Sequence, residues 1–304
     1  MMHCFRPPIM DLAMTEFLDS FRRFTNALEA PGNEVPAVGV HFFRHGEELP
    51  KEVLAYAPSE LTLTSCQAAK QAGLGDPVLL TLENIGCVAA AISFGLVDQN
   101  QSHPLQGARI YTDLMRQQST KNFQPPTPED FTSGKVYACK SAGYPDFCLF
   151  GTQDTGRFKN QEIARNAVLE MTAIQPAVTQ GVFLYPPDFT DFSMTPEVVV
   201  LSVRPVELTR IVQAYQYCTG KRIEASMGGL RAVNSDLIVR PYLTQKINVS
   251  PYCLGARLIG RYEADRLGIG IPYSLWTTLV VGMEESKGGF PFSKYPGAVD
   301  TDDG

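Results

Sequence analysis

The sequence predicts a mixed α/β protein, and three observations support this class. Residues 11–30 repeat apolar side chains every three to four positions with charges between them, which is typical of an amphipathic helix. Residues 35–43 and 196–203 are runs rich in β-branched residues, as expected for buried strands. A helical pattern that opens at Arg204 follows the second run directly and gives a strand-turn-helix unit. A mixed α+β arrangement remains an open alternative.

The same patterns place the other elements along the chain, although they do not predict the order of strands in the sheet. Helices are expected near six positions, namely Phe17, Ala68, Ala89, Ala167, Val212 and Trp276. Strands are expected near five positions, namely Val35, Val78, Val182, Val198 and Leu237.

We predict a single α/β domain over residues 35–282. Residues 1–34 would form a leader and the N-terminal helix, and the Gly-, Ser-, Pro- and Asp-rich residues 283–304 would form a flexible tail. An alternative divides the domain into two similar halves, 35–120 and 181–282, joined by a connection over 121–180. This internal duplication of a strand-turn-helix unit would give a pseudo-twofold arrangement.

A weak internal repeat motivates the duplication. Residues 78–87 contain Leu-Thr, then Asn84 and Cys87, and residues 241–253 contain Leu-Thr, then Asn248 and Cys253. The second copy needs an insertion of three residues, so coincidence among small apolar residues explains the match equally well. If the repeat is real, Cys87 and Cys253 would occupy equivalent positions and could meet across the pseudo-twofold axis.

Composition narrows the classes of partner and the compartment. The 304 residues are 44% hydrophobic and 19% charged, with a formal net charge of −6. This charge disfavours nucleic acid as a partner. The chain has no apolar run long enough to span a membrane and no signal-peptide pattern at its start. Seven cysteines, an odd number, do not form a secreted disulfide framework, so we expect a reducing, cytoplasmic location.

Two of these cysteines are expected at the starts of helices. Thr64 and Ser65 can cap a helix that begins at Cys66, and Cys87 precedes a run of small apolar residues. Free backbone N–H groups and the helix dipole at such positions favour the thiolate, which is the form that binds metal or attacks an electrophile.

Several separated motifs, in the same order, resemble the domain-of-unknown-function 169 family of prokaryotic-type proteins over about residues 35–282. They are Ser65-Cys66-Gln67-Ala68, Cys87 with its small-residue run to Gly95-Leu96, Pro196-Glu197-Val198-Val199-Val200, Gln213-Ala214, Ser235-Asp236, and Cys253 to Arg257 followed by Gly270-Ile271-Pro272. The resemblance implies a cysteine pattern that matches Cys66, Cys87 and Cys253. It also implies further cysteines in many members where this chain has Asn234 and Ala256.

Three cysteines of this pattern would suit an iron–sulfur cluster, because such clusters are held by thiolates. A 4Fe-4S cluster on Cys66, Cys87 and Cys253 would leave one iron for water, Asn234, Asp236 or a substrate. Arg231 and Arg257 are candidates to bind a small anionic molecule beside it, since guanidinium groups hold carboxylate or phosphate at two points. The wide spacing of the cysteines fits a closed structural zinc site less well.

Two other functions compete with this hypothesis. The chain can be a metal-free small-molecule binding or interaction module, in which the cysteines are core residues. Alternatively, Cys66 can be a nucleophile of low pKa. Because nucleotide-binding, hydrolase and zinc-protease motifs are absent from the sequence, no reaction or catalytic residue is predicted. The sequence does not predict the oligomeric state.

Overall fold

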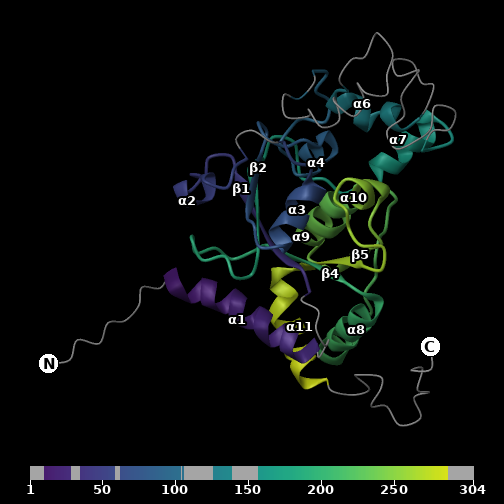
Figure 1. Cartoon of the computed structure of the whole chain (residues 1–304). Helices are drawn as coiled ribbons and strands as arrows, with labels where there is room; N and C mark the ends of the chain where they lie inside the picture. The colour runs from purple at the N-terminus through teal and green to yellow at the C-terminus, as the bar shows by residue number, and fades with distance from the viewer. Residues whose placement is uncertain are drawn as a thin grey trace.

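The computed structural model describes residues 10–28, 35–58, 62–103, 105, 126–138 and 157–286. Its centre is a sheet of six strands in the order β2-β3-β1-β4-β6-β5, in which every neighbouring pair is antiparallel (Figure 1). The strands are β1 Ala37–Arg44, β2 Val78–Thr81, β3 Thr179–Tyr185, β4 Val198–Val203, β5 Asn248–Ser250 and β6 Leu267–Pro272.

Helices cover this sheet, so the mixed α/β class is confirmed. The described α-helices are α1 Met10–Leu28, α2 Lys51–Leu54, α3 Ser65–Gly73, α4 Val88–Ser93, α6 Pro128–Thr132, α7 Gln161–Leu169, α8 Pro205–Thr219, α9 Arg240–Thr244, α10 Leu254–Leu258 and α11 Tyr273–Glu285. A 3-10 turn, η1, covers Lys135–Tyr137, and a π-helix, η2, covers Ala232–Val239. All six predicted helix positions lie in helices. Four of the five strand predictions are confirmed.

The prediction of a strand at Leu237 is wrong, because this residue lies in η2. All eight residues of η2 are buried, so their sequence carries no alternation that would separate a helix from a buried strand. Two glycines of β6 make room for the helix against the sheet. A Cβ at Gly268 would lie 2.2 Å from Cδ1 of Leu237, and one at Gly270 would lie 2.0 Å from the Leu237 carbonyl oxygen.

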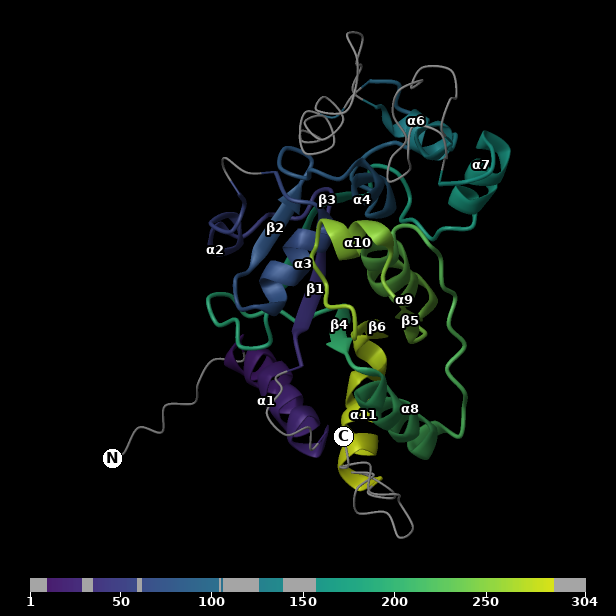
Figure 2. The same cartoon turned by 45° about the vertical axis from the view of Figure 1, so that its right-hand side comes forward.

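The alternating side chains of the strands separate two apolar cores. One core packs α1, α8 and α11 against one face of the sheet, with Phe17, Phe24 and Trp276 fully buried among them. The other core packs α3, α4 and η2 against the opposite face and includes Cys87 and Cys253. Figure 2 shows α1, α8 and α11 together, away from α3, α9 and α10. The cysteines of interest therefore belong to the second face.

The strand order reads the same from both edges of the sheet, as β2-β3-β1 and as β5-β6-β4. In each set the first strand along the chain is central, the second is at the edge, and the third lies between them. By topology the halves divide between β3 and β4, which differs from the predicted boundaries at 120 and 181. Residues 241–244 of the repeat also form α9, whereas residues 78–81 form β2. A common origin of the halves stays a prediction.

Residues 1–9 and 287–304, together with most of residues 104–156, lie outside the described ranges. The flexible tail is therefore untested over 287–304, and α11 continues to Glu285, past the predicted start of the tail. Within the described ranges, every helix is too short or too polar to cross a bilayer.

Candidate functional site

The three predicted cysteines, Cys66, Cys87 and Cys253, line one cavity. They come from separate parts of the chain, and each lies at the start of a helix: Cys66 in the first turn of α3, Cys87 as the N-cap of α4, and Cys253 as the N-cap of α10. The cavity encloses about 40 Å³. The fold thus brings together three thiols that are far apart in the sequence.

A capping box fixes the start of α3 beside this cavity. The Thr64 hydroxyl accepts the Gln67 N–H at 3.2 Å, and the Gln67 side chain in turn accepts the Thr64 N–H at 3.0 Å. This reciprocal pair satisfies backbone groups that helix termini leave without partners. It holds the first turn, and therefore Cys66, in one orientation.

Local backbone geometry positions the other two cysteines, Cys87 and Cys253. The sulfur of Cys87 accepts the Ala90 N–H at 3.3 Å, so this thiol itself caps α4. Cys253 follows Tyr252, whose φ of +65° lies in the left-handed region that non-glycine residues rarely adopt. Such strained residues cluster at functional sites, where the surrounding structure holds them.

Burial raises the pKa of the Cys66 thiol well above its usual value, and the neighbouring Cys253 and Cys87 raise it further. The direction is opposite to that expected for a thiol at a helix start, because desolvation of the thiolate outweighs the helix dipole. Without a positive partner at the sulfur, Cys66 is therefore a protonated thiol at neutral pH. This direction argues against a nucleophile of low pKa at Cys66, and that alternative stays a prediction.

The π-helix η2 and the residue before it provide the facing wall. Asn234, within η2, and Arg231, its N-cap, both line the cavity with the cysteines. Arg231 is 7% exposed, has a φ of +52° and forms a hydrogen bond with the hydroxyl of Tyr137. Its Nε and Nη2 atoms have no hydrogen-bond partner among the described residues.

The Ser65 hydroxyl also lines the cavity, where it contacts the Cys66 thiol. Nε and Nη2 of Arg231 therefore remain as the buried donors of this cavity without a partner among the described residues. Buried polar groups are normally paired, so each exception needs an explanation. The Arg231 guanidinium is thus the exception at this cavity.

Two predicted site residues lie elsewhere. Asp236 lines a neighbouring cleft, where its Oδ2 accepts the Gly228 N–H at 3.2 Å. Arg257 donates to the carbonyl oxygens of Pro251 at 2.8 Å, of Arg266 at 3.0 Å and of Glu263. This guanidinium closes the loops around α10, so it has a structural role that its sequence context did not reveal.

Sequence reasoning missed several residues of the cavity, among them Tyr137, Arg157 and Leu230. The first two flank residues 139–156 and are joined by a hydrogen bond from the Arg157 N–H to the Tyr137 carbonyl at 3.0 Å. Both residues fall within 121–180, which the sequence predicts only as a connection between two halves. An isolated tyrosine and an isolated arginine give no sequence signal for the site.

The three sulfurs do not converge on one point. Among the described residues, no three His, Cys, Asp or Glu side chains are arranged to hold a single metal ion. A zinc ion would need its sulfur ligands at about 2.3 Å. The cysteines of a cluster bind different iron atoms, so their sulfurs lie farther apart.

Comparison with known proteins supports the resemblance. A curated relative, Uncharacterized protein MJ0308 of Methanocaldococcus jannaschii, is 24% identical over 160 residues, which are 53% of this chain and 61% of the relative. The match thus spans less than two thirds of that protein. No solved structure matches the chain. The model of the DUF169 family, described as Uncharacterised ArCR, matches residues 29–282, which include all the cavity residues. The chain therefore belongs to the DUF169 family.

Proposed function

We propose that the chain holds an iron–sulfur cluster of the 4Fe-4S type through Cys66, Cys87 and Cys253 and acts on or senses a small anionic molecule there. The observation that carries the proposal is the meeting of these three cysteines, from three helix starts, at one cavity. Structural cysteines gather in cores as well, but helix starts supply backbone N–H groups that favour thiolates.

A hydroxyl group of the cavity fits an anionic cluster. Thiolate-held clusters accept hydrogen bonds at their sulfur atoms, which is one way in which proteins tune them. The Ser65 hydroxyl, which lies beside the Cys66 thiol at the cavity, is a donor that could serve this role. A bound metal would also remove the protons from the thiols, because metal ligands are deprotonated. This would offset the burial that raises the pKa of Cys66.

Asn234 would face the iron that lacks a cysteine. It lines the cavity and is 3% exposed, whereas Asp236 lies in the neighbouring cleft. An amide is a weaker ligand for iron than a thiolate, so this position would stay open to exchange. When bound, the cluster would supply a Lewis-acidic iron or an electron. The chain's own residues would bind, orient and shield the small molecule.

The test is iron and acid-labile sulfide analysis, with a visible absorption spectrum, on protein purified without oxygen. Wild type is compared with Cys66→Ser, Cys87→Ser and Cys253→Ser. Cys218→Ser is the matched control, because Cys218 is an exposed cysteine in the last turn of α8. We expect a broad visible band in wild type and the control, with the band weakened or lost in each of the three variants.

A well-folded wild type without iron and sulfide would contradict the proposal. The second candidate, a metal-free binding or interaction module, would then take its place. It is favoured by the position of Cys87 and Cys253 within the apolar core of their face. Under this function, the three serine variants would lower the free energy of unfolding and leave the metal content at zero throughout.

A further inference from the structure

Arg231 presents an empty hydrogen-bonding edge. Nε and Nη2 lie on the same edge of the planar guanidinium, so their N–H bonds point in parallel and suit the two oxygens of a carboxylate. Neither atom has a partner among the described residues, although Arg231 is buried. A buried donor without a partner lowers the stability of the fold. Binding of an acceptor at this edge is therefore favourable.

Arg231 also lies between two spaces. One is the cysteine cavity, of about 40 Å³, and the other is a cleft of about 300 Å³ between α7, α6 and the chain that follows α4. The smaller space is next to the three cysteines, whereas the larger cleft can hold the body of a small molecule. A ligand bound through Arg231 can therefore place its acid group beside the cysteines and its body in the cleft.

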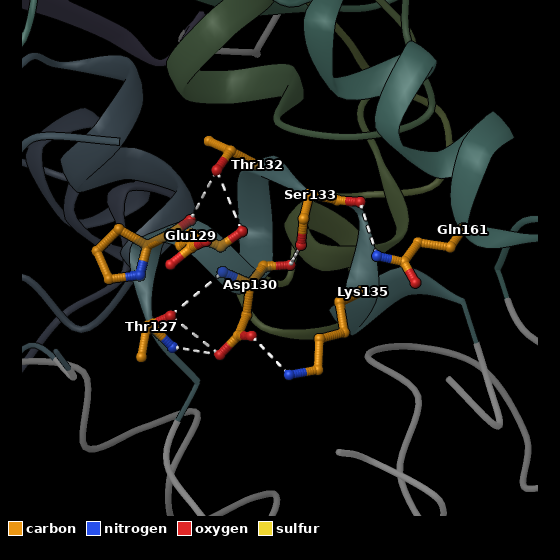
Figure 3. A network of polar contacts seen from close by, with 8 residues as sticks. Thr127, Glu129, Asp130, Thr132, Ser133, Lys135 and Gln161 are labelled. Carbon is orange, nitrogen blue, oxygen red and sulfur yellow. Dashed lines mark hydrogen bonds and ion pairs between the residues drawn. The ribbon is translucent and has the colours of Figure 1, made fainter. Parts of the chain in front are cut away.

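The wall of this cleft is held in place by its own hydrogen bonds, as Figure 3 shows around α6. Thr127 and Asp130 form a capping box, and Lys135 pairs with Asp130 at 3.0 Å. The Thr132 hydroxyl donates to carbonyl oxygens of its own helix and of Gln99. These bonds already use the polar side chains of α6. The α6 wall therefore defines the shape of the cleft and offers few free groups to a ligand.

Charge and lining indicate the class of ligand. Of the described cations that line the two spaces, Arg231 is the buried one; Arg157 is partly exposed and Arg165 is exposed. One buried positive charge balances one negative charge, whereas a phosphate dianion would keep an uncompensated charge. Ile92, Val168 and Met171 supply apolar surface to the cleft.

We propose that Arg231 binds the carboxylate of a small organic monocarboxylic acid, whose apolar body lies in the cleft between α6 and α7. This deepens the function proposed above by naming the class of its small anion. The binding itself needs no iron. The acid group would lie on the wall that carries Asn234, facing the three cysteines, so the cluster site and the ligand site would adjoin.

The experiment measures butyrate binding by calorimetry and by the shift of the melting temperature. Inorganic phosphate is the comparison anion, and both iron-free and anaerobically prepared protein are used. We expect butyrate to bind wild type more tightly than phosphate does. Arg231→Gln should weaken butyrate at least about tenfold, because two charge-assisted hydrogen bonds are lost. Arg231→Lys should restore part of the affinity, since lysine keeps the charge without the paired edge.

Two further variants keep the test informative. Arg222→Gln, at an exposed arginine, is the matched control and should leave butyrate binding unchanged. Ala173→Phe, at an exposed position that lines the cleft, should block butyrate by filling the space while Arg231 stays intact. A buried charge with unpaired donors is unfavourable for folding. Because Arg231→Gln removes this charge, the variant should fold.

Equal affinity of butyrate and phosphate, or butyrate binding that survives Arg231→Gln, would overturn this inference. Absence of butyrate binding to wild type in both preparations would do the same and would leave Arg231 as a counter-charge for the cysteine site. Failure of the cluster proposal looks different: iron and sulfide would be absent, and butyrate would still bind the iron-free protein.

Discussion

At the scale of single residues, Asp236 shows how the fold changes the ionisation of a side chain. Burial raises the pKa of Asp236 to about 7, and the Gly228 N–H, the Ser250 hydroxyl and the charge of Arg240 counteract the rise in part. An aspartate in the unfolded chain titrates near 3.8. Between these two values the folded protein keeps a proton that the unfolded chain has lost.

This difference predicts how stability depends on pH. Because the folded state binds the extra proton, the free energy of unfolding should fall as pH rises from about 4 to about 7 and then level off. Asp236→Asn cannot ionise, so it should be more stable than wild type at about pH 8, by roughly 2 to 4 kcal/mol, and similar to it at about pH 4. Urea unfolding of both proteins over this range measures the effect. Parallel pH profiles would contradict it.

Asn234 gives a second prediction at this scale. It lines the cavity with the three cysteines, and the family resemblance implies a cysteine there in many members. If the cluster proposal holds, Asn234→Cys should supply a fourth thiolate and protect the exposed iron. We expect the visible band of the variant to decay more slowly in air than that of wild type. An equal or faster decay would show that residue 234 does not face the iron.

At the scale of elements, the sequence was informative wherever the local pattern decides the structure. The capped start at Thr64, the continuous apolar run of β4 and the helix that opens at Pro205 were all recognisable from the chain. The π-helix η2 was not, because its geometry depends on contacts with the glycines of β6 rather than on its own side chains. Tertiary contact overrides local propensity in such buried runs.

In the candidate site too, local patterns were predictable from the sequence and tertiary contacts were not. Helix starts placed Cys66 and Cys87 from sequence, and the fold brought Cys253 beside them. The role of Arg257 was not predictable, because its three carbonyl partners come together only after the chain has folded around α10. Tyr137 was missed for a similar reason, since its hydrogen bond with Arg231 joins segments almost one hundred positions apart.

The dependence of η2 on β6 can be tested directly. Gly270→Ala would bring a Cβ to 2.0 Å from the Leu237 carbonyl oxygen, so η2 or the strand has to move. We expect the free energy of unfolding to fall by about 3 kcal/mol, as for other overpacked cores. Gly229→Ala is the control, because a Cβ there meets nothing within 4 Å. Denaturant midpoints of both variants measure the difference, and similar midpoints would refute tight packing of η2.

At the scale of the whole molecule, the sheet separates the cysteine face from an aromatic face. Trp276, the single tryptophan of the chain, is fully buried on the aromatic face and donates to the Ser20 hydroxyl of α1 at 2.9 Å. Its ring centre lies 5.1 Å from that of Phe24. The whole of α1 precedes the family match, which begins at residue 29, yet it covers this core.

This separation predicts that the aromatic face can be weakened without loss of the cysteine site. Phe24→Ala should lower the free energy of unfolding by about 3 to 5 kcal/mol and shift Trp276 emission to longer wavelength, because the cavity admits water near the indole. Phe21→Ala is the control: Phe21 is partly exposed, so its loss should cost less. Iron content or butyrate binding, measured below the unfolding transition, should equal that of wild type. A loss of either in folded Phe24→Ala would show that the two faces are coupled through the sheet.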